Sequence, residues 1–398
     1  MKWEKVKLGK YVEILSGFAF KSKDFLNCGV PVIKIKNITQ EGVTLEDVSY
    51  ISKELADKNE KYHLNYNDIL IALTGSHINQ MSSVVGRIAR IKYHEDSLLN
   101  QRVGKVFAKD SKLCDIDYVY YFLSQDYIKI SLASKAGGAA NQANISPNDV
   151  KSLTVRWPDI ETQHRIADIL SAYDDLIENN QKQIKLLEEA AQRLYKEWFV
   201  NLRFPGHENT KIVDGVPEGW KKERLVDIAE IQYGYAFDGT LFNADKNGTP
   251  IIRIRNIPQA ETMDYTTEHV SENYLVQNGE IIVGMDGEFH INAWAGNTAY
   301  LVQRVCCIRP KNTEIKGWLL QAIYEPIKFF EHTVVGATVS HLGKKHLDSI
   351  YLLTSPEEFY KPFKTFFDKR LLLMNQNRKL REARDRLLPK LMSGKVKV

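Results

Sequence analysis

The sequence predicts an α+β fold with two similar globular domains separated by a long antiparallel two-helix coiled coil, in a pseudo-two-fold, circular organisation. Two observations lead to this prediction. One pattern of residue types occurs twice in the chain. Each copy is followed by a long polar segment in which apolar residues recur at helical spacing. Because the repeated unit is far longer than a solenoid repeat, each copy should be a globular domain followed by one helix.

The duplication consists of the same residue types in the same order at nearly the same spacing. The clearest pairs are Trp3 and Trp220, Gly17 and Gly234, Ala19-Phe20 and Ala236-Phe237, Gln101-Arg102-Val103 and Gln303-Arg304-Val305, and Gly138-Ala139 and Gly336-Ala337. The match spans too many positions to arise by chance, so one domain type is present twice.

Within each copy, short runs rich in Val, Ile and Leu and bounded by Gly, Asn or Asp predict strands. These runs are Val30–Ile35, Asp68–Leu73 and Val103–Phe107 in the first copy, and Ile251–Ile254, Glu280–Val283 and Tyr300–Ile308 in the second. Helical spacing of apolar residues predicts one helix over Ile116–Ser131 and another over Trp318–Glu331. Each copy is therefore expected to be an α+β domain.

A long helix is expected after each copy. The first should run from about Asp159, its N-cap, to about Trp198. The second should open with the capping box Ser355-Pro356-Glu357-Glu358 and stop at Gly394. Pro389 should loosen or kink the last turns of the second helix.

Apolar residues recur along both helices at spacings that alternate between four and three, which is typical of a coiled-coil seam. The first helix ends where the second copy begins, and the second helix starts where that copy ends, so the helices should run antiparallel. Pairing Trp198 with Phe359 and counting layers then places Asn180 opposite Asn377. Two facing buried amides would fix the register, because any slip would leave each against an apolar neighbour.

The helix length gives the coiled coil a possible role as a spacer. A helix of about 38 residues is about 57 Å long at 1.5 Å per residue. The coiled coil should therefore hold the two copies a fixed distance apart and bring the amino and carboxyl termini close together.

Composition excludes little but agrees with this organisation. With 398 residues the chain can form two full cores, and its net charge of +4 permits a nucleic-acid partner without requiring one. The second long helix is basic, and its basic face is either solvated or contacts phosphate or a partner. No apolar run approaches the roughly 18 residues of a membrane span, and no signal peptide is recognisable, so we expect a cytoplasmic protein without a membrane partner.

The chain contains no recognisable catalytic motif. It has no Asn-Pro or Asp-Pro-Pro motif of an amino-methyltransferase, no Gly-rich methyl-donor loop and no Walker motif. Its four cysteines include no CxxC pair, and His77, His290 and His341 lack partners at metal-ligand spacing. The sequence therefore predicts no catalytic residue and no metal site.

Three sequence segments are typical of one protein family. They are Gln192–Phe199 at the end of the first long helix, Val216–Trp220 at the entry to the second copy, and Arg384–Gly394 at the end of the second helix. With the duplication, these segments make the whole chain resemble the specificity subunit of type I restriction-modification systems. The resemblance implies target recognition domains over residues 1–158 and 202–356, a central conserved helix over 159–201 and a C-terminal conserved helix over 357–398.

The same resemblance implies a DNA-reading scaffold. Each recognition domain would read one half of a split target in double-stranded DNA, with the coiled coil as the ruler between the halves. Two modification (methyltransferase) subunits would dock on the conserved helices and carry S-adenosylmethionine, so that this chain needs no cofactor of its own. Whether restriction (translocase/nuclease) subunits also join is left open.

Candidate DNA-reading residues are polar side chains in the loops that differ between the copies, because Asn and Gln can bond adenine edges and Lys can reach guanine or phosphate. In the first copy they are Ser76, His77, Asn79, Gln80, Lys135, Asn141, Gln142 and Asn144. In the second copy they are Glu288, His290, Asn292, Thr338, Ser340, His341, Lys344 and Lys345. An ordinary solvated loop residue is the alternative for each, and the differences between the loops predict an asymmetric target.

Arg102 and Arg304 occur at the same place in both copies. A residue shared by two domains with different targets suits a contact to the DNA backbone, or a structural ion pair, better than sequence readout. Both are therefore included as DNA-binding candidates in a positioning role.

Two other classes of function compete with the DNA reader. One is a two-domain enzyme such as a fused methyltransferase, against which the missing motifs argue and which a methylation assay on this chain alone would detect. The other is a structural spacer without a nucleic-acid role, which binding to duplex DNA would exclude.

Overall fold

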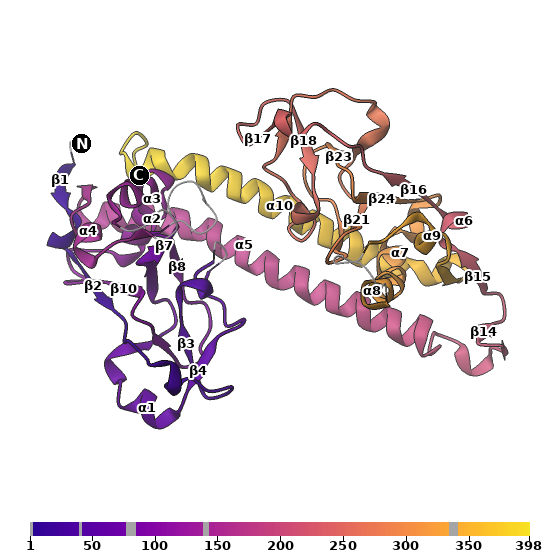
Figure 1. Ribbon diagram of the computed structural model, residues 1–398, viewed down its shortest axis with the longest axis horizontal. Helices are drawn as coiled ribbons and strands as arrows, with labels where there is room; N and C mark the ends of the chain where they lie inside the picture. Colours follow the sequence, from indigo (N-terminus) through magenta and orange to yellow (C-terminus); the bar gives the residue numbers. More distant parts are fainter. Residues whose placement is uncertain (1–2, 40–41, 77–84, 138–142, 334–340) are drawn as a thin grey trace. The chain divides into compact units, whose positions relative to one another are not determined.

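The structure, a computed structural model, describes residues 3–39, 42–76, 85–137, 143–333 and 341–398 (Figure 1). It separates into two units, Met1–Asp174 with Glu382–Val398, and Asp175–Arg381. Each unit contains one of the two copies together with part of both long helices.

The first copy is built on two four-stranded sheets. One has the order β2 (Val12–Ser16), β10 (Val103–Ala108), β6 (Ile69–Ala72) and β8 (Ile88–Arg90). The other has the order β4 (Ser49–Ile51), β3 (Val30–Ile33), β9 (Ser97–Leu99) and β5 (His63–Leu64). The remaining elements are β1 (Glu4–Lys7) paired with β12 (Thr154–Trp157), β7 (Thr74–Gly75) paired with β11 (Ala143–Asn144), and the helices α1 (Lys53–Asp57), α2 (Ile116–Ser124), α3 (Asp126–Lys135) and α4 (Pro147–Lys151).

The second copy repeats this arrangement. Its first sheet has the order β16 (Ala229–Tyr233), β24 (Val305–Pro310), β21 (Ile281–Gly284) and β22 (Ile291–Ala293). Its second sheet has the order β17 (Phe242–Asn243), β19 (Tyr265–Thr266), β18 (Thr249–Ile252), β23 (Ala299–Leu301) and β20 (Leu275–Val276). The remaining elements are the pairs β13 (Ile212–Val213) with β14 (Val216–Pro217) and β15 (Lys221–Arg224) with β25 (Tyr351–Thr354), and the helices α6 (Leu225–Ile228), α7 (Lys316–Ala322), α8 (Tyr324–Thr333) and α9 (Lys344–Asp348).

Strand order and direction confirm that one domain type is present twice. In both copies a single parallel pair, β3 with β9 and β18 with β23, lies within an otherwise antiparallel second sheet. The recurring glycines have the same physical cause in each copy. A Cβ atom on Gly17 would lie 2.3 Å from the carbonyl oxygen of Asn100, and one on Gly234 would lie 2.1 Å from that of Val302. Only glycine permits this close approach of two backbones.

Three elements that were predicted to be continuous are each interrupted in the structure. The strand expected over Tyr300–Ile308 is divided into β23 and β24, because Arg304 adopts a positive φ of 69° and turns the chain from one sheet into the other. The helix expected over Ile116–Ser131 is broken at Gln125, whose backbone is extended. The helix expected over Trp318–Glu331 is divided into α7 and α8, since Pro326 has no N–H to continue the hydrogen bonding of the preceding turn.

The first long helix agrees with the prediction. α5 spans Ile160–Tyr195 and continues as one π-helical segment, Lys196–Val200. Asp159 caps it, since a carboxylate oxygen accepts the backbone N–H of Thr162 at 2.9 Å.

The second long helix, α10, spans Lys361–Met392 and follows a 3-10 segment, Glu357–Tyr360. The predicted capping box is wrong, because the Ser355 hydroxyl bonds to the Pro356 carbonyl and no side chain caps the helix start. The helix runs through Pro389 and ends where predicted, with Gly394 at a φ of +69°.

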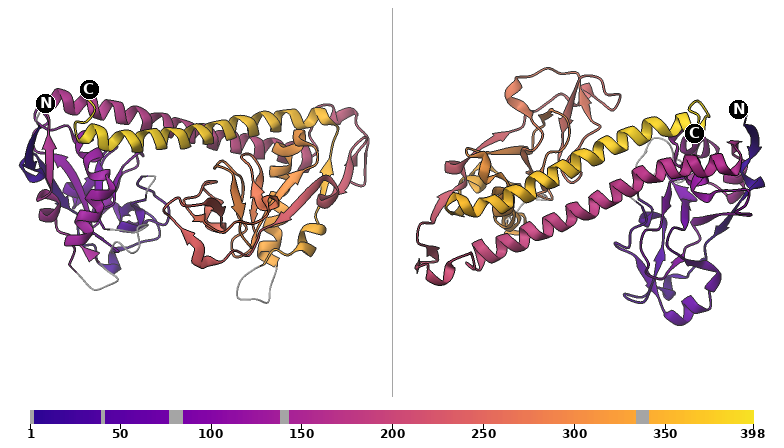
Figure 2. Two further views of the ribbon diagram at one scale, coloured as in Figure 1. Left: turned by 90° about the horizontal axis from the view of Figure 1, so that it is seen from above. Right: turned by 180° about the vertical axis from the view of Figure 1, so that it is seen from behind.

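Both views of Figure 2 show α5 and α10 side by side within each unit. In the first unit, Ile166 and Leu170 of α5 share a buried cluster with Leu391 and Met392 of α10. The two ends of the described chain also lie in this unit, where a Cβ atom on Gly394 would lie 3.4 Å from the ring of Trp3. No helix formed by the described residues is both long enough and apolar enough to cross a membrane.

Candidate nucleic-acid interface

In each copy, the end of a central strand meets a turn and a returning loop at one junction. In the second copy, the Met285 N–H donates to the carbonyl of Arg304 at 2.8 Å, and the Leu342 N–H donates to the carbonyl of Met285 at 2.7 Å. In the first copy, the equivalent bonds join Leu73 to Arg102 and Ile145 to Leu73, both at 2.9 Å. The backbone of the junction is therefore the same in both domains.

The side chains at this junction differ. In the first copy the Thr74 hydroxyl donates to the carboxamide oxygen of Asn144 at 2.8 Å. In the second copy Asp286 occupies the place of Thr74 and His341 the place of Asn144, and Nδ1 of His341 lies 2.5 Å from a carboxylate oxygen of Asp286. The other oxygen of Asp286 accepts from the guanidinium of Arg304.

These contacts affect the ionisation of Asp286. Burial alone would raise its pKa, but the hydrogen bonds from His341 and Arg304 outweigh burial and hold the pKa of the carboxyl below its usual value. Asp286 therefore remains an anion between two nitrogen donors. Of the two roles expected for Arg304, the structure contains the ion pair.

Several other sequence-predicted residues lie at the surface. Arg102, Lys135 at the end of α3, and Lys344 and Lys345 in the first turn of α9 are exposed. Glu288 and His290 form an ion pair of 3.5 Å at the start of β22. The candidates outside the described residues are His77, Asn79, Gln80, Asn141, Gln142, Thr338 and Ser340.

Two of the predicted residues lie inside the protein instead. Ser76 is buried beside the junction of the first copy. Asn292 on β22 is also buried, and its amide donates to the carbonyls of Ile257 and Pro258 at 2.9 and 3.0 Å. Hydrogen bonds inside the protein occupy both the amide nitrogen and the carboxamide oxygen of Asn292, so it is not proposed as a base-reading residue.

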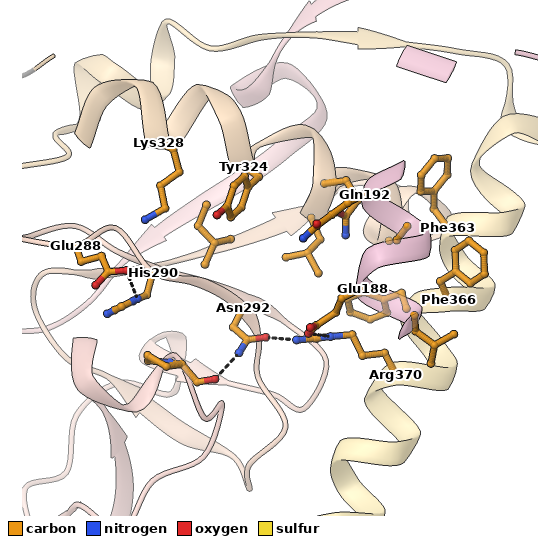
Figure 3. Close-up of a pocket in the computed structure, with 18 residues that line it drawn as sticks. Glu188, Gln192, Glu288, His290, Asn292, Tyr324, Lys328, Phe363, Phe366 and Arg370 are labelled. Carbon is orange, nitrogen blue, oxygen red and sulfur yellow. Dashed lines mark hydrogen bonds and ion pairs between the residues drawn. The ribbon is translucent and has the colours of Figure 1, made fainter. Parts of the chain in front are cut away.

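Asn292 belongs to a network beside a pocket of about 290 Å³ (Figure 3). Its carboxamide oxygen accepts from Arg370 of α10 at 2.7 Å, and the same guanidinium donates to Glu188 of α5 at 2.6 Å. Tyr324 and Lys328 of α8 line the same pocket. Arg370 thereby connects both long helices to the second copy.

The first unit has a matching connection. Arg384 of α10 bonds to Asp174 of α5 at 2.5 Å, and the other Asp174 oxygen accepts the hydroxyl of Tyr121 on α2 at 2.7 Å. Burial alone would lower the pKa of Arg384, but its contacts with Asp174 raise it overall. Arg370 and Arg384 stand one heptad before and one heptad after Asn377 in the sequence.

Asn180 and Asn377 are in direct contact with each other. In the sequence, each lies between the residues that form these two connections. The amide of Asn180 donates to the carboxamide oxygen of Asn377 at 2.9 Å, and the amide of Asn377 donates to the carbonyl of Ile177 at 3.2 Å. Both side chains are buried. In the second unit Trp198 also packs against Phe359, with ring centroids 5.9 Å apart, so the helices of this unit run antiparallel.

Asp286, Thr74, Glu188, Asp174 and Tyr121 belong to these networks but were not expected from the sequence. Asp286 and Thr74 stand at the equivalent position of the duplication, six residues after Glu280 and Asp68, so an alignment of the copies could have found them. Glu188 and Asp174 lie beside the seam and gave no signal until Arg370 and Arg384 were placed on it. Among the described residues, no group of three or more His, Cys, Asp or Glu side chains is placed to hold a metal ion.

Two matched α+β domains with different polar junctions, each followed by one long helix, have the organisation of a two-domain recognition scaffold. The family model described as the type I restriction modification DNA specificity domain matches residues 1–189 and 217–358. The chain therefore belongs to the family of type I restriction-modification DNA specificity subunits. It selects the DNA sequence for such a system and is not itself an enzyme.

Relatives support this assignment over the full length. The chain is similar to the type I restriction enzyme MjaIX specificity subunit of Methanocaldococcus jannaschii, at 24% identity, with 100% of this chain and 94% of that protein covered. It is 31% identical to the EcoBI specificity subunit of Escherichia coli over 35% of this chain and 30% of that protein. The crystal structure of the type-I restriction-modification S subunit from M. genitalium has the same fold, with a TM-score of 0.58, 15% identity, and 98% and 96% of the two chains covered.

Proposed function

We propose that the chain reads a bipartite, asymmetric target in double-stranded DNA, with residues 1–158 reading one half-site and residues 202–356 the other. One observation supports this most strongly. The two domains share the backbone of the junction at Leu73 and Met285 but present Thr74 with Asn144 in one and Asp286 with His341 in the other. Equal scaffolds with different hydrogen-bonding groups select different bases.

The residues proposed to contact DNA are those at the surface near the junctions and those in the loops that the structure leaves undescribed. The exposed or partly exposed ones are Arg102, Lys135, Asn144, Glu288, His290, Arg304, His341, Lys344 and Lys345. The lysines and Arg102 are suited to phosphate, where they position the duplex without reading it.

We infer that the two long helices form the ruler between the half-sites and the platform for two modification subunits, which carry S-adenosylmethionine. Large apolar side chains at the helix surface support a protein partner. Leu186 of α5 is 63% exposed and Leu372 of α10 is 56% exposed. Exposed leucines on a helix suit the apolar core of an interface. The complex would act on DNA in the cytoplasm.

The docking proposal gives a first prediction. The double variant Leu186→Glu with Leu372→Glu should weaken binding of the modification subunit at least tenfold, because two charges would be placed in an apolar contact. Isothermal titration with the purified modification subunit measures this. Leu113→Glu is the matched control, since Leu113 is 54% exposed in the first recognition domain and should leave the affinity unchanged. Equal losses in both variants would contradict docking on the helices.

The reading function itself is tested by methylation of a randomised duplex library. The complex of this chain with its modification subunits should transfer methyl groups from S-adenosylmethionine only to duplexes with two different half-sites at one fixed spacing. The chain alone should transfer none. Methylation without a second half-site, or turnover by the isolated chain, would reject the proposal.

A further inference from the structure

The junction of the second domain contains an acid, Asp286, with His341 and Arg304, where the first domain has the neutral pair Thr74 and Asn144 beside Arg102. Asp286 is 10% exposed, whereas the side chains of His341 and Arg304 are 58% and 64% exposed. One carboxylate thus lies beneath two exposed nitrogen-bearing groups. Its two oxygens are divided between them, Oδ1 to His341 and Oδ2 to Arg304.

This arrangement fixes the direction of both exposed groups. Bonding at Nδ1 turns the opposite ring nitrogen of His341, Nε2, away from Asp286. A guanidinium has five N–H donors in a planar fork, so the contact with Asp286 leaves Arg304 with further donors at the surface. A side chain already held in one orientation loses less conformational freedom when it binds.

Arg304 is also fixed through its backbone. Its φ of 69° is uncommon for a residue other than glycine, and its carbonyl accepts the N–H of Met285 at 2.8 Å. The turn before β24 therefore holds the Cα of Arg304 while Asp286 holds its guanidinium.

Asp286 is the acid that contacts both His341 and Arg304. The other ionisable groups on the described segments around the junction include Glu288, His290, Lys328, Glu331, Lys344, Lys345 and His346. Glu331 bonds to Lys328 and to the N–H of Phe289, and Nδ1 of His346 accepts the N–H of Gly343. In the contacts that the described residues make, neither Glu331 nor His346 bonds to Asp286, His341 or Arg304.

We propose that Asp286 is a positioning residue for base recognition, which holds Arg304 against the edge of a guanine in the second half-site with His341 beside it. Guanine presents two acceptors, N7 and O6, in the major groove, and a guanidinium fork donates to both. In the first domain Thr74 holds Asn144, whose carboxamide offers a donor and an acceptor, the pattern that matches adenine. In the first domain the position of Asp286 is occupied by Thr74, so no acid there orients Arg102. Arg102 is therefore proposed to contact a phosphate. The inference rests on the proposed reading of two half-sites.

The test is the target profile of the complex with its modification subunits on a randomised duplex library. Asp286→Asn should lower the preference for guanine at one position of the second half-site at least tenfold and leave the first half-site unchanged. The exchange Asp286→Thr with His341→Asn, which installs the pair of the first domain, should move that position toward adenine. Arg304→Lys should also weaken the guanine preference while it keeps the charge, because an ammonium has no planar fork that Asp286 can hold in one orientation.

A purely structural ion pair would behave differently. Asp264→Asn is the control, since Asp264 pairs with Arg255 at 2.5 Å elsewhere in the same domain and should leave the target unchanged. If the wild-type complex reads two half-sites but Asp286→Asn and Arg304→Lys retain the guanine preference, this inference fails and the proposed function stands. The same holds if both weaken binding equally for every DNA sequence. If the wild-type complex shows no bipartite preference, the proposed function fails as well.

Discussion

Replacing Asn377 with leucine is expected to lower the free energy of unfolding by about 2 kcal/mol, because the buried amide of Asn180 would lose its hydrogen-bond partner. The contact is direct, at 2.9 Å, and Asn377 is only 2% exposed, so water cannot replace it without opening the seam. Urea unfolding of the chain measures the change. Gln376→Leu is the matched control, because Gln376 is exposed on the same turn of α10 and should change stability by no more than about 0.5 kcal/mol.

The double variant Asn180→Leu with Asn377→Leu separates stability from register. Two facing leucines remove the unsatisfied amide, so stability should return to the wild-type value or exceed it. The seam would then lack the feature that penalises a slip, and the spacing between half-sites should become heterogeneous. A single sharp spacing in the target profile of this variant would show that other contacts set the register.

Lengthening both helices is expected to change the spacer and nothing else in the target. Four residues inserted in α5 between Asn180 and Glu188, and four in α10 between Arg370 and Asn377, keep both polar pairs matched. The insertion adds about 6 Å along the helices, near two base-pair steps. The target profile should show both half-sites unchanged and their separation increased by about two base pairs.

An insertion in α5 alone is the control for this experiment. It would place one of the two polar pairs out of register, so it should reduce methylation rather than give a new spacing. If the double insertion altered a half-site sequence and left the spacer unchanged, the helices would not be the ruler.

Much of the fold could be predicted because the duplication tests each pattern twice. The strands β6 and β21 were placed within a residue or two of their observed bounds, and α5 begins one residue after its predicted cap. The contact of Asn180 with Asn377 was expected from chain order and spacing alone. Such features depend on local periodicity and topology, which the sequence contains.

The errors arose where tertiary contacts overrule a local pattern. The apolar run Tyr300–Ile308 looks like one strand, but its two halves join different sheets through the turn at Arg304. Ser355 has the sequence of a helix cap, yet its backbone N–H bonds to the Tyr360 hydroxyl. Asn292 resembled a loop residue and is instead held by Arg370, a residue 78 positions away.

The residues proposed to read bases could be predicted by type but not by role. His341 was expected as a polar residue of a loop that differs between the copies, and Arg304 as a residue that both copies share. A single sequence does not show that one acid contacts both. That acid, Asp286, lies in a short segment with no recognisable motif. It is 55 positions from His341 in the sequence, and the two side chains meet only in the folded protein.

Replacement of one domain by the other tests most directly whether the two similar domains read two different half-sites. Residues 202–356 would be replaced by a second copy of residues 1–158, and the complex with modification subunits would be profiled on the randomised library. The expected target is an inverted repeat of the first half-site at the original spacing, because both reading heads would then be the same. An unchanged asymmetric target would contradict the claim.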